Sequence, residues 1–171
     1  MKKFERIWNI VYYFVWLGMG KFGEIINKPT DLIVNNMPYF QRRFKEHNFD
    51  PKKVYLRVMN DLHFGWNQMY ASGVMMILMV SIWMSIYFPI PKYCASFGAN
   101  PELVLGIFII GVIAFIFLPQ WYFIWRGDKY IRYFREFKRK PHKWKVKWAW
   151  ISLIIILIPI AIFALVVHFF L

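Results

Sequence analysis

The chain has 171 residues, enough for one domain, and its composition differs from that of soluble proteins. Hydrophobic residues make up 59% of it and charged residues 18%, against about 25% charged in typical soluble chains. A soluble domain of this size could not bury so much apolar surface, because small domains leave a large share of their surface exposed. Together with a formal net charge of +13, the composition excludes an ordinary soluble domain and indicates a basic membrane protein.

The first predicted element is a short helix that lies in the membrane interface. Residues 1–6 are basic, and residues 7–17 form an apolar stretch of 11 residues, about half the length that crosses a bilayer. Its aromatic side chains are of the types that gather at the membrane–water boundary: Trp8, Tyr12, Tyr13, Phe14 and Trp16. We therefore expect an interfacial amphipathic helix here, with a re-entrant or tilted fourth span as the alternative.

Turn and cap signals divide the segment that leads to the first span. Residues 28–31, Lys-Pro-Thr-Asp, predict a turn with an N-cap, and Pro38 predicts the start of a new helix. Asp50 followed by Pro51 predicts another start, because aspartate caps a helix N-terminus and proline suits its first position. That helix carries an apolar face at helical spacing: Tyr55, Val58, Met59, Leu62 and Trp66. We expect it to follow the inner membrane surface and to turn into the first span at Gly65.

Three runs without Asp, Glu, Lys or Arg predict three transmembrane helices. They are residues 62–91, with an apolar core at 69–90, residues 103–125 and residues 148–171. A helix rises about 1.5 Å per residue and the hydrocarbon layer is about 30 Å thick, so about 20 residues are enough to cross it. All three runs are therefore long enough to span a membrane.

The predicted fold is an all-α integral membrane protein in two parts. Residues 1–68 form an interfacial and amphipathic helical region on the inner side of the membrane. Residues 69–171 form a three-helix transmembrane domain, in which residues 126–147 are a basic inner hairpin loop.

The distribution of charge predicts the orientation. Residues 1–68 carry 11 Lys or Arg and 6 Asp or Glu, and residues 126–147 carry 10 and 2. The connection at residues 91–102 carries one of each sign. Because basic segments remain on the cytoplasmic side, we expect both basic segments on the cytoplasmic or matrix side of the membrane. The connection 91–102 and the C-terminus then lie on the other side.

The basic hairpin loop is the strongest candidate binding site. Gly127 and Asp128 begin it, Pro141 ends its helix, and Tyr130, Phe134 and Phe137 share one apolar face. The candidate residues for binding lipid or a partner are Lys129, Arg132, Arg135, Lys138, Arg139, Lys140 and Lys143. Such a cluster sets topology and attracts anionic lipid, worth about 1 kcal/mol per cation near the surface. Docking onto an acidic partner subunit is the alternative, and we do not expect nucleic acid to bind.

The predicted spans carry few of the side chains that membrane chemistry uses. Within residues 69–90, 103–125 and 148–171, His168 is the only acidic, basic or histidine residue. His63 and His168 fall at opposite ends of the bilayer, so one haem could not use both. The sequence shows no nucleophile–base set, metal-ligand cluster or phosphate-binding glycine loop. We therefore expect no enzymatic activity, no small-molecule substrate, no metal and no cofactor, although bound phospholipids are expected.

The first span is rich in methionine, and Met75 and Met79 share a face. A Met-x-x-x-Met pair in a three-span chain resembles the copper-transporter family, since thioethers suit Cu(I). The chain departs from that family in its basic N-terminus, predicted to face inward, and in the absence of Gly-x-x-x-Gly from its third span. Methionine also fills gaps in packed helix contacts, and we expect that role here.

Small residues mark where transmembrane helices approach one another. The candidate helix-packing residues are Gly73, Ser81 and Ser85 in the first span, and Ala161 and Ala164 in the third. We expect them to make contacts within the chain. Gly106 and Gly111 are five residues apart, which does not match the dimer motif.

These observations favour a non-catalytic accessory subunit that stabilises a larger membrane complex. Aromatic residues make up 22% of the chain, and such side chains suit both membrane interfaces and contacts with partner proteins. The expected location is a mitochondrial inner membrane or a bacterial cytoplasmic membrane, and the expected host is a respiratory-type complex with other membrane subunits. The alternative is a self-assembling channel or membrane-disrupting effector, with the Gly73, Ser81 and Ser85 face as its lining.

Overall fold

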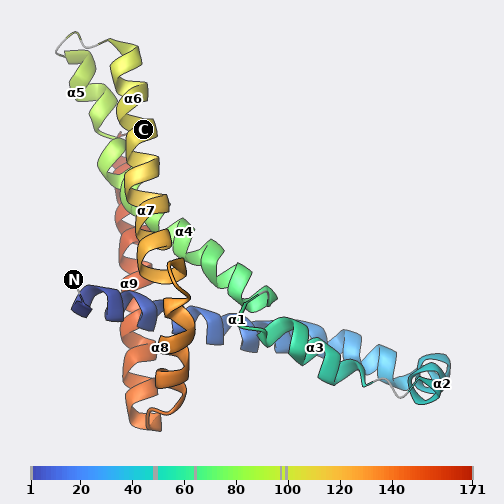
Figure 1. Ribbon diagram of the computed structural model, residues 1–171. Helices are drawn as coiled ribbons and strands as arrows, with labels where there is room; N and C mark the ends of the chain where they lie inside the picture. Colours follow the sequence, from blue (N-terminus) through green and yellow to red (C-terminus); the bar gives the residue numbers. More distant parts are fainter. Residues whose placement is uncertain (1, 48–49, 64, 97, 99, 171) are drawn as a thin grey trace. The chain divides into compact units, whose positions relative to one another are not determined.

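The computed structural model of the chain describes residues 2–47, 50–63, 65–96, 98 and 100–170 (Figure 1). It is 89% helical, and the described residues include no strand. The prediction of an all-α fold is therefore confirmed. The chain divides into two compact units, one formed by Met1–Phe14 with Gly73–Leu171 and the other by Val15–Ser72.

Two helices contribute to both units: α1 (Lys2–Asn36) and α4 (Trp66–Tyr87). The first turns of α1 belong to the unit that contains the basic hairpin, whereas the rest of α1 belongs to the other. The predicted border at residues 68 and 69 was drawn by position relative to the membrane. The two compact units are defined by packing and have other boundaries, so the predicted border stays a prediction.

In the unit Val15–Ser72, the predicted turn at residues 28–31 is wrong. Helix α1 continues through these residues and ends at Asn36. A proline removes one backbone donor from a helix, but the hydrogen bonds on either side of it can carry the helix onward. The predicted restart at Pro38 is confirmed, because α2 spans Pro38–Glu46.

Helix α3 (Pro51–Asn60) begins as predicted and ends sooner than predicted. The Asp50 carboxylate accepts a hydrogen bond from the Lys53 backbone N–H at 3.1 Å, which confirms the cap. At the other end, the Asp61 carboxylate accepts one from the His63 backbone N–H at 2.7 Å. This local turn competes with the next helical hydrogen bonds. Leu62 and Trp66 are therefore not on α3, and the expectation that they share its apolar face is wrong.

Three helical segments are long and apolar enough to cross a membrane: Trp66–Lys92, Glu102–Trp125 and His142–Phe170. They confirm the three predicted spans. Helix α1 is not among these segments. With 35 residues it is much longer than the short helix predicted at residues 7–17, and its position in the membrane interface stays a prediction. A further short helix, α5 (Ile90–Ser96), begins in the last residues of the first of these segments and contains the free Cys94.

The second span is not a uniform α-helix. It consists of α6 (Pro101–Gly111), the π-helical η1 (Val112–Phe117), the short α7 (Leu118–Gln120) and the π-helical η2 (Trp121–Trp125). Pro119 lies within α7, between the two π-helical segments. A proline cannot donate to the carbonyl four residues earlier and its ring crowds that carbonyl, so a widened helix accommodates it more easily.

The first two spans pack through aromatic rings and one glycine. The Trp83 and Phe115 rings stack with centroids 5.2 Å apart, and the Tyr87 and Phe108 rings lie 4.9 Å apart. Gly111 is buried directly under Trp83, so that a Cβ added at this glycine would overlap the indole ring. The absence of a side chain at Gly111 therefore permits this close approach.

A tight turn joins the second span to α8 (Lys129–Lys138). Gly127 has a φ of +68° and Asp128 a φ of +51°, and glycine and aspartate are among the residues that adopt this left-handed region most readily. Helix α8 lies beside the first turns of α9 (His142–Phe170), as Figure 1 shows. The Phe137 and Trp144 rings are 5.4 Å apart, and Lys145 Nζ donates to the Lys138 carbonyl at 2.9 Å.

Candidate functional site

The start of α1 packs against the aromatic face of α8. The Tyr13 ring lies 5.0 Å from that of Phe134 and 5.6 Å from that of Phe137, and the Tyr12 ring lies 5.8 Å from that of Tyr130. All five side chains are at most 3% exposed. The predicted apolar face of the hairpin helix is therefore confirmed, and the residues that cover it come from the predicted interfacial helix.

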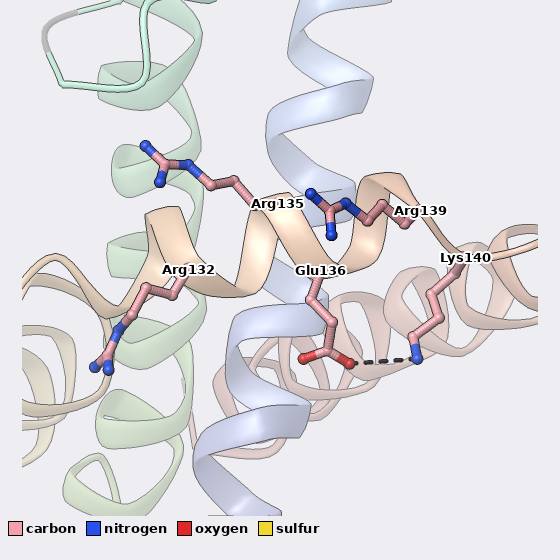
Figure 2. A pocket seen from close by; sticks show the side chains of 5 residues that line it. All are labelled: Arg132, Arg135, Glu136, Arg139 and Lys140. Carbon is pink, nitrogen blue, oxygen red and sulfur yellow. Dashed lines mark ion pairs between the residues drawn. The ribbon is translucent and has the colours of Figure 1, made fainter.

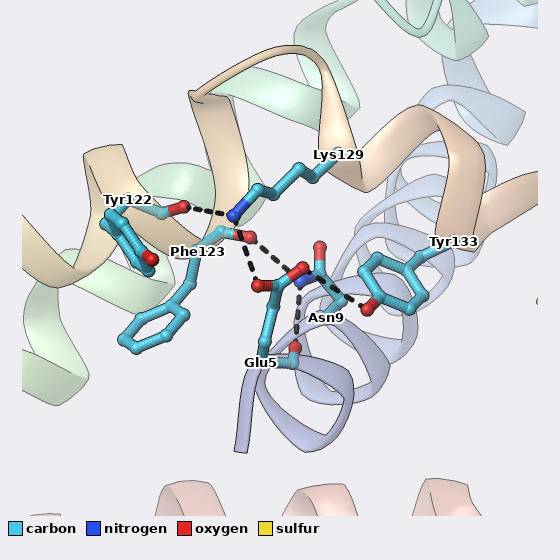
Figure 3. A network of polar contacts seen from close by, with 6 residues as sticks. All are labelled: Glu5, Asn9, Tyr122, Phe123, Lys129 and Tyr133. Carbon is cyan, nitrogen blue, oxygen red and sulfur yellow. Dashed lines mark hydrogen bonds and ion pairs between the residues drawn. The ribbon is translucent and has the colours of Figure 1, made fainter. Parts of the chain in front are cut away.

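A polar network joins the same two helices to the end of the second span (Figure 3). Lys129 Nζ lies 3.1 Å from Glu5 Oε2 and donates to the Tyr122 carbonyl at 3.0 Å. The same ammonium group lies 4.5 Å from the centroid of the Tyr122 ring, within cation–π range. The side chains of Lys129 and Glu5 are only 17% and 18% exposed. A partly buried ion pair with extra hydrogen bonds of this kind fixes the position of both helices.

Asn9 and Tyr133 extend this network. Asn9 is fully buried, and its Nδ2 donates to the carbonyls of Glu5 and Phe123, both at 2.9 Å. The Tyr133 hydroxyl donates to Glu5 Oε1 at 3.3 Å. Burial first, and then the neighbouring Glu5 carboxylate, raise the pKa of the Tyr133 phenol above its ordinary value. The phenol therefore stays protonated at neutral pH and remains a donor to the carboxylate.

A second set of charges lies on the solvent-exposed surface of the same helix pair. Arg6 Nη2 lies 2.7 Å from Glu136 Oε1, and Lys140 Nζ lies 3.4 Å from the same oxygen. Glu136 is therefore shared between two cations. These side chains are 35% to 47% exposed, so the pairs are weaker than the one at Lys129.

Three exposed arginines remain, Arg132 and Arg135 on α8 and Arg139 at its C-cap, and they are here called the arginine stripe. Within the part of the chain that the structure describes, none of them forms an ion pair. Together with Glu136 and Lys140 they line a shallow open depression (Figure 2). Figure 2 shows Arg135 and Arg139 extending to one side of α8, whereas Glu136 extends to the other and meets Lys140.

The predicted lipid- or partner-binding residues thus separate into groups. Lys129 is held in the internal ion pair, and Lys140 is paired with Glu136. Lys138 and Lys143 are exposed, as are the three arginines of the stripe. The geometry therefore favours the stripe as a binding surface and gives Lys129 a structural role.

The predicted helix-packing residues also differ among themselves. Ser81 is buried and its hydroxyl donates to the Ile77 carbonyl of the same helix at 2.9 Å, and the Ser85 hydroxyl donates to the Ser81 carbonyl at 2.7 Å. A Cβ at Gly73 would meet no other atom within 4 Å. Ala161 and Ala164 are exposed in this chain. The role of these five residues in helix packing stays a prediction.

Sequence reasoning missed two residues of the second span, Gly111 and Gln120. Gln120 is fully buried, and among the described residues no group bonds to either atom of its amide. It is the only Asn or Gln among residues 103–125. Polar side chains inside a span normally need a partner, so this isolated amide was a signal that a search for charged residues alone overlooked.

The described residues contain no group of three or more His, Cys, Asp or Glu side chains placed to hold a metal ion. Comparison with known proteins does not add a functional assignment. No protein-family model, no curated protein and no solved structure matches the chain.

Proposed function

We propose that this multi-pass membrane protein is a non-catalytic accessory subunit that joins and stabilises a larger inner-membrane assembly. The observation that supports this proposal most is the arginine stripe. Its three guanidinium groups are exposed without ion pairs in the described chain, while Glu5 and Glu136 beside them are already paired with other cations. Such a surface is available to negative groups of another molecule.

The spans also leave most of their apolar surface bare. In the most apolar stretch of each span, only 28%, 11% and 6% is buried within the chain, in order along the sequence. Lipid can cover such surfaces, and so can the spans of other subunits. The third span leaves the largest share of its apolar surface for contact with a neighbour, since only 6% of its most apolar stretch is buried within the chain.

The proposed location is the inner membrane of a mitochondrion or the cytoplasmic membrane of a bacterium. The proposed orientation places the N-terminus and the basic hairpin on the matrix or cytoplasmic side, following the charge distribution. A respiratory-type host rests on composition alone and stays a prediction.

The test is purification of the tagged full-length chain from its own membrane in mild detergent. We expect unlike membrane proteins to copurify at a fixed ratio, as measured by gel filtration and mass spectrometry. A closed oligomer of identical chains would instead support the channel. A monomer without partners would contradict both readings.

The channel alternative receives less support from the first span. Its candidate lining includes Ser81 and Ser85, whose hydroxyls are hydrogen-bonded to carbonyls of their own helix. Ser81 is also buried, at 6% exposure. These two side chains therefore offer little polar surface to a pore.

A further inference from the structure

We infer that the arginine stripe, Arg132, Arg135 and Arg139, docks a carboxylate-rich segment of a partner protein beside the membrane. This inference rests on the proposed function and names the chemistry of the partner. The competing occupant is a layer of anionic lipid headgroups. Three features of the unit that contains α8 favour the protein.

The first feature is that packing fixes the stripe in place. Residues 132, 135 and 139 are spaced i, i+3 and i+7, so their backbone positions lie near one another along α8 and its C-cap. Figure 2 shows the side chains of Arg135 and Arg139 extending to one side and that of Arg132 extending to the side of Glu136. Phe134 and Phe137 occupy the buried side and are fully buried. Rotation of the helix would expose these two rings to water, so packing opposes it and favours the face seen in the structure. A surface ordered in advance binds more tightly because less entropy is lost on binding.

The second feature is the state of the neighbouring acids. Glu5 and Glu136 lie in the two depressions over α8 and the start of α1. Glu5 is paired with Lys129, and Glu136 is shared by Arg6 and Lys140. Arg132 lines the second depression together with both carboxylates, yet among the described residues neither carboxylate forms an ion pair with an arginine of the stripe. The arginines of the stripe are therefore available to carboxylates of another molecule.

The third feature is the direction of α8 relative to the third span. Helix α8 lies alongside the first turns of α9, so its axis follows the span rather than the membrane plane (Figure 1). The seven residues from Arg132 to Arg139 rise by about 10 Å. In the proposed orientation, with the third span crossing the bilayer, Arg139 would stand about one screening length farther from the membrane than Arg132. The attraction of a charged lipid surface fades over that distance.

A headgroup layer is flat and suits a helix whose cations all lie at one depth, which is the arrangement of an interfacial amphipathic helix. Arginines that lie at increasing distances from the membrane are better placed to contact the side of a neighbouring protein. Guanidinium groups bind carboxylates through two parallel hydrogen bonds, and Arg135 and Arg139 are one helical turn apart. An acidic segment whose carboxylates are three or four residues apart on a helix would match them.

The test uses the tagged full-length chain with a photoreactive amino acid in place of Lys138, expressed in its own membrane. After irradiation, protein and lipid adducts are distinguished by mass spectrometry. We expect a protein adduct at a peptide that contains clustered Asp or Glu. In the chain that also carries Arg132→Lys, Arg135→Lys and Arg139→Lys, the yield of this adduct should fall about tenfold, because lysine keeps the charge and loses the bidentate bonds.

The matched control carries Arg42→Lys, Arg43→Lys and Arg57→Lys, the same exchange at three arginines of the other unit, and should keep the adduct. Adducts with phospholipid alone would overturn the inference in favour of the lipid surface. Partners that copurify in full with the triple-lysine chain would also overturn it, while leaving the proposed function intact. Absence of any copurifying partner would instead overturn the proposed function, and this inference with it.

Discussion

At the scale of single residues, position on α8 gives chemically similar cations different roles. Lys129 lies on the side that faces α1, where it meets a carboxylate, a carbonyl and an aromatic ring. Arg132, only three residues later, is exposed and unpaired within the described chain. Both side chains carry one positive charge, and the difference is that Lys129 is covered by α1 and the end of the second span whereas Arg132 remains exposed.

The Lys129→Met variant tests the internal ion pair. Removing the ammonium group leaves the partly buried Glu5 carboxylate without its cation, which should weaken the attachment of α1 to α8 by about 2 kcal/mol. We expect faster hydrogen exchange in residues 5–14, measured by mass spectrometry in detergent. The control is Lys143→Met, at an exposed position, which should leave exchange in this segment unchanged. Unchanged exchange in Lys129→Met would show that the pair does not hold the helix.

Gln120 offers a second test at the residue scale. Its amide is fully buried and unbonded within the described chain, so the amide opposes folding. Gln120→Met keeps a similar volume and removes the polar atoms, and we expect it to raise the free energy of unfolding by about 1–3 kcal/mol. Thermal unfolding in detergent measures this change. Gln120→Glu should act in the opposite direction. A loss of stability in Gln120→Met would mean that the amide is bonded in the membrane.

At the scale of elements, the contact between the first two spans depends on the packing of the large Trp83 ring over Gly111, which has no side chain. The Trp83 indole covers Gly111 and stacks on Phe115 one turn later. Gly106, on the same helix, has open space at its Cβ position. The two glycines therefore differ in function although both belong to α6.

Exchange of these glycines tests the contact. Gly111→Ala should cost about 1–3 kcal/mol, because the new methyl group collides with the indole ring. Gly106→Ala should be neutral or stabilising by up to about 1 kcal/mol, since alanine favours the helix. Unfolding in detergent compares the two variants. The double variant Gly111→Ala with Trp83→Leu should recover part of the lost stability, because the smaller leucine leaves room for the new methyl group. If Gly111→Ala is as stable as Gly106→Ala, the two spans do not pack through this contact.

At the scale of the whole molecule, the main expectation is the orientation in the membrane. The charge distribution places α5 and α8 on opposite sides. Cys94 in α5 is a free, partly exposed thiol. We expect a membrane-impermeant thiol reagent added from the outer side to label it. A Lys138→Cys variant, made together with Cys94→Ser, should not be labelled until the membrane is opened. Labelling in the reverse order would invert the topology.

Much of the architecture follows from patterns that local physics interprets directly. Runs longer than about 20 apolar residues predict spans because a bilayer has a defined thickness, and all three predicted spans are present. The cap at Asp50 and the apolar face of Tyr130, Phe134 and Phe137 follow from helix geometry alone, and both are confirmed. These features depend on neighbours along the chain or on the solvent, so no knowledge of distant contacts was needed.

Other features depend on which distant segments meet. No local pattern shows that residue 5 pairs with residue 129, or that residue 111 receives residue 83. For the same reason the candidate site in the sequence was a cluster of seven cations. Packing of α1 on α8 places Lys129 in an internal ion pair, and Lys140 pairs with Glu136, so the exposed cations that remain are the three arginines of the stripe with Lys138 and Lys143. Sequence by itself determined how many helices are long and apolar enough to cross a membrane, because bilayer thickness sets that length, and tertiary structure alone decided which charges remain for another molecule.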